Sequence, residues 1–185
     1  SKSTKKAAER AHKFIGIQHP PDSALIIPCV SSGERNYIPV GFVDSSYVIN
    51  NNAHAIYNPD IFIFSFVSSK MHMAWVNVVS GRMRSDFNYS SSFCYNPFPI
   101  PKIDIQIKKN LEKLAFEIID IREKFPDLTI AQLYNNETMP TLLKNAHQNL
   151  DKIIDRCYRN DEFKSGDDRI KFLFKMYEND KKNLI

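Results

Sequence analysis

Hydrophobic and polar positions follow different patterns in the two halves of the chain. After residue 101, apolar side chains recur at helical spacing and predict amphipathic helices over 105–124, 141–158 and 167–182. The middle helix carries an apolar seam with alternating three- and four-residue steps, formed by Leu143, Ala146, Leu150, Ile153 and Cys157. Thr129-Ile130-Ala131-Gln132 has the spacing of a capping box and predicts a further short helix. The second half is therefore expected to form a small helical bundle.

The first half alternates short β-rich runs with turns. Runs of β-branched and aromatic residues predict strands at 24–30, 37–43 and 47–50. Pro28 and Pro39 are expected to make the first two of these edge or bulged strands, because proline cannot donate to a sheet ladder. Asn50-Asn51-Asn52 predicts a turn.

Three other segments of the first half have weaker patterns. Residues 5–15 predict a short helix, and KMHMAWVNVV (70–79) predicts a mostly buried one inside the apolar stretch 60–79. Residues 82–96 have no clear period and predict a loop or a short hairpin. The fold class that follows is α+β: a mixed α/β lobe with a small, partly antiparallel sheet, then a C-terminal helical bundle.

Charge changes abruptly near residue 101. The first 100 residues hold nine basic and six acidic side chains, whereas the remaining 85 hold 16 and 15. Eight of the ten prolines fall at or before Pro101. We therefore divide the chain into two domains, at 1–100 and 101–185.

Composition narrows the classes of activity. The chain has only five glycines and no glycine-rich phosphate-binding motif, which argues against a self-contained nucleotide-binding enzyme. The spacings of histidine and cysteine give no metal motif, and no nucleophile motif occurs. A net charge of +4 is compatible with a polyanionic partner without requiring one.

The cysteines and the apolar runs indicate the compartment. Cys29, Cys94 and Cys157 are odd in number and scattered, as is typical of free thiols in a reducing environment. The longest apolar run, 61–67, is too short to span a bilayer, and no apolar segment follows the N-terminal lysines. We expect a cytoplasmic protein with no membrane partner.

The segment YNPFP (95–99) looks at first like the Asn-Pro-Pro-aromatic loop with which adenine amino-methyltransferases hold the target amine. Here the second proline and the aromatic residue are exchanged, and no glycine-rich cofactor strand precedes them. Prolines at 97, 99 and 101 favour an extended, stiff connector instead. The favoured interpretation is a joint between the two halves.

The remaining polar constellation is GRMRSDFNYSSS (81–92). In an extended segment Arg82 and Arg84 would project from the same face, because they are two residues apart. The planar fork of arginine matches the two acceptors of guanine in the major groove, and Asp86 could hold that fork or accept from a cytosine amine. From these residues alone, a surface ion pair is the favoured interpretation.

Four motifs in a fixed order favour a role in DNA recognition over a surface ion pair. They are SSGERNYIPVGF (31–42), SSKMHMAW (68–75), GRMRSDFNYS (81–90) and YNPFPIP (95–101). This string resembles the target recognition domain of type IIL (MmeI-like) restriction–modification enzymes over about residues 20–102. The rest of the chain is similar to the helical region that follows in that family. Those enzymes join a nuclease, an adenine amino-methyltransferase, a target recognition domain and a helical tail in one long chain.

The resemblance implies sequence-specific recognition of double-stranded DNA, with bases read in the major groove. In the family, the positions on either side of the serine in Gly-Arg-x-x-Ser-x read one base pair. Here these are Arg84 and Asp86, a combination associated with guanine. Met71, Met73 and Trp75 are expected in the core. Roles in DNA-backbone contact or in support of the site are expected for Arg82, Ser85, Asn88, Tyr89, Ser90, Arg35, Lys70 and His72. For Arg82, Arg35 and Lys70, a pairing within the protein is the open alternative.

The resemblance also implies what this chain lacks. S-adenosylmethionine, and Mg²⁺ where a nuclease is present, would bind other segments of a longer prokaryotic protein, whose methyltransferase domain would be a partner of this chain. No catalytic residue, metal site or cofactor is expected here. Two alternatives remain open at this stage: a catalytic methyltransferase fragment that uses Asn96, and a helical protein-interaction module without DNA contact.

Overall fold

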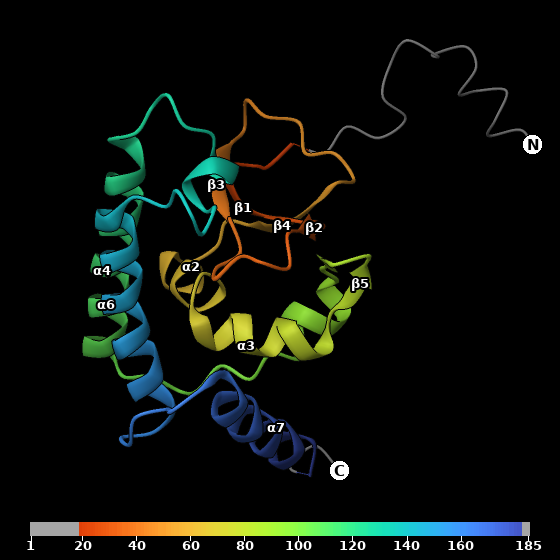
Figure 1. Ribbon diagram of the computed structural model, residues 1–185, viewed down its shortest axis with the longest axis vertical. Coiled ribbons are helices and arrows are strands. Elements are labelled where there is room, and N and C mark those ends of the chain that lie inside the picture. Colours follow the sequence, from red (N-terminus) through yellow and green to blue (C-terminus); the bar gives the residue numbers. More distant parts are fainter. Residues whose placement is uncertain (1–18, 183–185) are drawn as a thin grey trace, which may run out of the picture.

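The computed structural model describes residues 19–182, so the helix expected at 5–15 lies outside the described residues. Two small antiparallel sheets pack beside a central pair of helices, and the three long C-terminal helices cover other sides of that pair (Figure 1). The predicted α+β class, with small sheets followed by helices, is confirmed.

The first sheet has the strand order β3-β1-β4. β1 (Ser23–Pro28) is its central strand and pairs antiparallel with β3 (Gly41–Asp44) and with β4 (Ala53–Tyr57). The expectation that Pro28 marks an edge or bulged strand is wrong. Pro28 is the last residue of β1, where a missing N–H interrupts only the end of the ladder.

Two of the predicted strands differ from the structure. The segment 37–40 is buried irregular chain, so only the end of the predicted strand 37–43 becomes β3. No strand forms at 47–50; the next strand is β4, beyond the predicted asparagine turn. β4 has the sequence AHAIY, with few strong β-formers, and its pairing with β1, including Leu25 opposite Ile56, selects it instead.

The second sheet has the order β2-β6-β5 and is reached through Cys29. The predicted strand 24–30 is interrupted there, between β1 and β2 (Val30–Ser31). The Cys29 N–H donates to the Asn52 carbonyl at 2.9 Å, and its own carbonyl accepts from the Tyr89 N–H at 2.8 Å. One residue thus connects the two sheets. The hairpin predicted within 82–96 is present as β5 (Gly81–Met83) and β6 (Asp86–Asn88), followed by a π-helical turn, η1 (Ser91–Tyr95).

The apolar stretch 60–79 forms two helices, α2 (Ile61–Val67) and α3 (Lys70–Val79). They meet at Ser68 and Ser69, and the Ser69 hydroxyl caps α3 by accepting from the His72 N–H at 3.2 Å. Residues 71–76 are buried, which confirms the predicted core helix. Within residues 19–182 no single helix is long and apolar enough to cross a membrane; α2 and α3 meet that criterion only as a pair bent by 58°.

The C-terminal helices agree closely with the sequence pattern. They are α4 (Ile105–Glu123), α5 (Ile130–Leu133), α6 (Thr141–Tyr158) and α7 (Gly166–Lys182). The predicted capping box of α5 is present in both directions, between Thr129 and Gln132. In α6 the buried seam runs through Leu143, Ala146, Leu150 and Ile154, whereas the predicted Ile153 and Cys157 are half-buried against the same core.

One continuous apolar core connects both halves of the chain. α4 packs between α2 and α6, and α7 lies along α3 (Figure 1). The ring of Trp75, the core residue predicted in α3, lies 5.4 Å from that of Phe174 in α7. The change in sequence character near residue 101 is therefore not a gap in packing, and the division at 1–100 and 101–185 remains a prediction.

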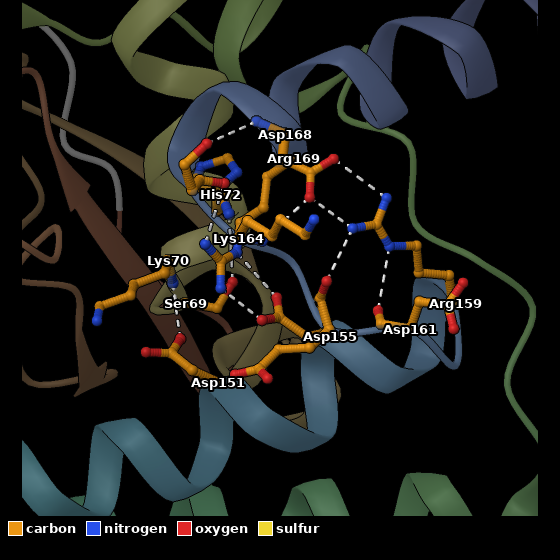
Figure 2. Close-up of polar contacts among 12 residues, drawn as sticks. Ser69, Lys70, His72, Asp151, Asp155, Arg159, Asp161, Lys164, Asp168 and Arg169 are labelled. Carbon is orange, nitrogen blue, oxygen red and sulfur yellow. Dashed lines mark hydrogen bonds and ion pairs between the residues drawn. The ribbon is translucent and has the colours of Figure 1, made fainter.

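A buried carboxylate of α6 joins the two halves (Figure 2). The Asp151 side chain accepts from the Lys70 backbone N–H at 2.8 Å. It also accepts from the Tyr37 hydroxyl at 2.7 Å. Burial raises the pKa of Asp151 to about 6, although the bonds from Lys70 and Tyr37 favour the charged form. Asp151 therefore fixes the start of α3 and the 31–37 loop with one side chain.

Replacement of Asp151 by asparagine is expected to remove a pH-dependent part of the stability. The carboxyl pKa is about 6 in the folded protein against 3.8 without its surroundings, so the folded state binds the proton more tightly. The stabilisation from this tighter proton binding is fully present below pH 3.8. It decreases as pH rises through 6, and the free energy of unfolding falls by about 3 kcal/mol over that range. Urea unfolding between pH 4 and 7 measures this as a difference between wild type and Asp151→Asn. Parallel pH profiles for the two proteins would contradict the assignment.

Candidate nucleic-acid interface

The hairpin β5–β6 carries the two residues singled out by the sequence motif. Arg82 lies opposite Phe87, and Met83 lies opposite Asp86, with the two-residue turn Arg84–Ser85 between the strands. Phe87 is completely buried, so its face of the hairpin points into the protein. The opposite face carries Met83, Asp86 and Asn88 by strand alternation. We call residues 81–88 the recognition hairpin.

Arg84 has a backbone conformation that the sequence did not predict. Its φ is +59°, in the left-handed region, because it is the first residue of the turn. The expected extended geometry, with Arg82 and Arg84 on one face, is therefore wrong. Positive φ at a non-glycine residue costs about 1–2 kcal/mol, and two-residue hairpin turns favour such conformations. The exposed Arg84 side chain stands at the tip of the hairpin.

Arg82 is held within the protein. Its guanidinium lies 4.1 Å from the centre of the Phe87 ring and donates to the carbonyl oxygens of Ser85 and Asn77, at 3.4 and 3.3 Å. These contacts fasten the turn to the end of α3. Between Arg84 and Asp86, by contrast, the described residues show no ion pair, and neither side chain has a hydrogen-bond partner. The two predicted base-reading side chains are thus available to a ligand.

Two histidines support the strand that leaves the hairpin. The Tyr89 hydroxyl lies 3.0 Å from His72 Nε2, and the Tyr89 carbonyl lies 3.1 Å from His54 Nε2. His72 is fully buried and Tyr89 is nearly so. Burial lowers the pKa of His72 to about 3 and raises that of Tyr89, so both side chains stay neutral. Neither side chain reaches the surface, and of the two roles predicted for them only support of the site fits this geometry.

The other predicted residues lie around the hairpin in different settings. Ser85 and Asn88 are exposed, whereas Ser90 is half-buried and its carbonyl accepts from the Cys94 N–H at 2.7 Å. The Arg35 guanidinium donates to the Ser31 hydroxyl at 3.2 Å and to the Ala131 carbonyl at 3.4 Å, so it links the 31–37 loop to α5. The structure thus brings Arg84, Ser85, Asp86 and Asn88 together on one hairpin and gives Arg35 contacts within the protein.

Gly33 lies against the turn of the hairpin, a contact that the sequence pattern did not identify. A Cβ atom at Gly33 would lie 2.2 Å from the Ser85 carbonyl oxygen, much too close for any other residue. The 31–37 loop therefore lies directly against the turn of the recognition hairpin. The available signal was weak: one of only five glycines, inside the first family motif.

The YNPFP segment is a structural joint. Phe98 is buried, and its ring meets that of His72 edge-on with 4.5 Å between centroids. The Pro99 carbonyl accepts from the Tyr158 hydroxyl of α6 at 2.9 Å. An aromatic ring that must stack on an extruded base would have to be accessible, and Phe98 is not. Among residues 19–182, no group of three or more His, Cys, Asp or Glu side chains is arranged to hold a metal ion.

Comparison with known proteins identifies the family. Residues 1–102 match the family described as "MmeI, target recognition domain", and residues 103–185 match "MmeI, C-terminal domain". The chain therefore belongs to the MmeI family, as its motifs predicted. DNA methyltransferase A of Bacillus subtilis (strain 168) is 39% identical over 177 residues, which cover 96% of this chain and 20% of that protein.

A solved structure gives the same result. The type IIL restriction–modification enzyme MmeI, determined in complex with DNA, matches with a TM-score of 0.89 and 37% identity. The match covers 97% of this chain and 24% of that one. The chain thus spans about a fifth to a quarter of the length of these relatives.

Glycine at position 84 is expected to stabilise the protein. Arg84→Gly removes left-handed strain of about 1–2 kcal/mol and adds about 0.5–1 kcal/mol of backbone entropy cost, a net gain of up to about 1.5 kcal/mol. The matched control is Ser85→Gly, whose φ is not positive, and which is expected to destabilise by about 0.5–1 kcal/mol. Denaturant unfolding of both variants tests the difference, and a change of the same sign in both would exclude strain at Arg84.

Proposed function

We propose that this chain recognises a specific DNA sequence on behalf of an adenine amino-methyltransferase, and that the recognition hairpin reads bases in the major groove. The observation that carries the proposal is the pair Arg84 and Asp86: a basic tip and an adjacent carboxylate, both without partners among the described residues. A two-stranded ribbon fits the width of the major groove.

The relatives support DNA as the partner. One is a DNA methyltransferase by name, and the other is a restriction–modification enzyme bound to DNA. In this proposal residues 1–100 recognise the target, and 101–185 hold the recognition residues in place. The methyltransferase domain of the same protein would be the second partner. S-adenosylmethionine, and Mg²⁺ if the protein also cleaves DNA, would bind outside this chain, which has no glycine-rich cofactor motif and, among residues 19–182, no group of metal-ligating side chains.

The chemistry assigns different tasks within the hairpin. The Arg84 fork can donate to O6 and N7 of one guanine, a pairing that discriminates by about 1–3 kcal/mol. Asp86 would orient that fork or accept from the cytosine amine of the same pair. Exposed Ser85 and Asn88 are short donors suited to phosphate contacts. Arg82, Tyr89 and His72 would act through the position of the hairpin.

Exchange of the two charged residues should change the base that is accepted. Arg84→Glu with Asp86→Arg replaces a fork that donates to guanine by an acceptor, so preference at one position of the site should shift by about 1–3 kcal/mol. Selection from duplexes with randomised sequence measures this for the chain, and methylation-site mapping measures it for a full-length enzyme. An unchanged preferred sequence would overturn the assignment.

DNA binding and cofactor binding separate this proposal from the two alternative functions. A helical protein-interaction module predicts that the exchange leaves DNA affinity unaltered. A catalytic fragment that uses Asn96 predicts that this chain alone binds S-adenosylmethionine, which calorimetry detects directly.

A substitution at Gly33 should disturb recognition while the proposed base-reading side chains stay the same. In Gly33→Ala the new methyl group meets the Ser85 carbonyl oxygen, so the turn that carries Arg84 must move. We expect discrimination against a mismatched site to fall about tenfold, consistent with a loss of 1–2 kcal/mol. The matched control is Gly41→Ala, where the new atom meets only the Ile130 side chain, at an ordinary 3.5 Å. Equal discrimination in the two variants would contradict the contact.

A further inference from the structure

A polar pocket lies where the 31–37 loop, the start of α3 and α6 meet. It has a volume of about 250 Å³. Its polar lining side chains are Asn36, Lys70, Asn136, Lys144 and Gln148. Residues from both halves of the chain therefore share one hollow, and none of the residues that line it is acidic.

The two lysines are available for a ligand. Lys70 hydrogen-bonds to Asp151 only through its backbone N–H (Figure 2). Among the described residues, neither Lys70 nor Lys144 has an ion pair or a side-chain hydrogen bond. The Asp151 carboxylate attracts the Lys70 ammonium, but the two side chains form no ion pair, so the ammonium keeps its donors for a ligand.

The carboxamides form a fixed wall. The Asn136 side-chain oxygen accepts from the Asn36 backbone N–H at 3.1 Å and from its amide at 2.8 Å, and the Asn136 amide donates to the Glu34 carbonyl. These bonds hold the 31–37 loop against the segment that precedes α6. Two ammonium groups beside ordered amides suit an oxyanion with several acceptor oxygens, such as a phosphate.

The pocket lies close to the recognition hairpin along the chain. Gly33 touches the turn at Ser85, and Asn36 lines the pocket three residues later. Three residues span at most about 11 Å even when fully extended. A ribbon in a major groove about 12 Å wide has the bordering phosphates at a comparable distance. The pocket wall at Asn36 therefore lies within about 11 Å of the Gly33 contact with the hairpin, close enough for one duplex to reach both.

We propose that Lys70 and Lys144 together bind one phosphate of the DNA backbone, so that the C-terminal part of the chain takes a direct part in DNA binding. The inference rests on the proposed function, since it takes the bound polyanion to be the DNA that the recognition hairpin reads. Lys70 supplies charge from the first half, and Lys144 supplies it from α6.

Salt dependence of duplex binding tests the pocket. The chain, Lys70→Gln, Lys144→Gln and the double variant are titrated with a fluorescent 30-bp duplex that carries the preferred site, and with a mismatched one, at several salt concentrations. Each single variant should weaken both duplexes alike, about tenfold, and should reduce the salt slope by up to about 0.9. Because one phosphate is shared, the double variant should lose little more than either single variant. Lys175→Gln, an exposed lysine of α7, is the control and should keep the wild-type slope.

The outcomes separate the pocket from the hairpin. One outcome is that Lys144→Gln keeps the wild-type salt slope of duplex binding while the Arg84 and Asp86 exchange still abolishes discrimination between the two duplexes. That outcome overturns phosphate binding in the pocket and leaves the role of the hairpin intact. Additive losses in the double variant overturn the shared phosphate. Binding of inorganic phosphate that depends on Lys144, together with an unchanged duplex slope, assigns the pocket to a free anion and also overturns the proposal. Absence of any duplex binding by the wild-type chain contradicts the proposed function itself.

Discussion

The buried carboxylate of Asp151 is the constraint on which the arrangement of this chain depends. It accepts from a backbone N–H of α3 and from the Tyr37 hydroxyl. Among the described residues it forms no ion pair, although the Lys70 and Arg169 side chains interact with its charge. A buried acceptor that loses its donors costs about 1–3 kcal/mol, so α6, the start of α3 and the 31–37 loop are held in one relative position. The recognition hairpin leaves the other end of α3 and touches that same loop at Gly33. α3 and the 31–37 loop, which together hold the hairpin, are thus both positioned by Asp151 of α6.

Much of the fold could be predicted because the information is local. The helical periodicity of α4, α6 and α7, the capping box of α5 and the buried face of α3 each lie within one segment. The strands were harder: β4 has weak propensity and exists because β1 offers it a partner, whereas 47–50 has strong propensity and no partner. Whether β4 and 47–50 form strands depends on pairing with a distant segment, and local sequence does not predict that pairing.

The candidate site likewise has a part that the sequence predicted and a part that depends on long-range contacts. Arg84 and Asp86 were identified from a motif, and the structure places them together on one hairpin. Tyr89 and His72 were expected to contact the DNA backbone or to support the site, but the contacts that hold the hairpin were not predicted. His54 and His72 lie against Tyr89, and Gly33 lies against the turn, from distant parts of the sequence. Lys144, which shares a pocket with Lys70, carries no signal in the sequence either, because an exposed lysine on a charged helix is ordinary. Side chains that meet only after folding have no pattern of their own.

The positive φ of Arg84 has a consequence for how this protein can change. Valine, isoleucine and threonine are poorly tolerated in the left-handed region, because their branched Cβ meets the backbone. Position 86, in a regular strand, has no such restriction. The backbone therefore restricts the residue types allowed at position 84 more than those at position 86, whatever ligand binds. New variants would draw on a narrow set of residues at the tip, mostly unbranched or small, and on a much wider set two residues later.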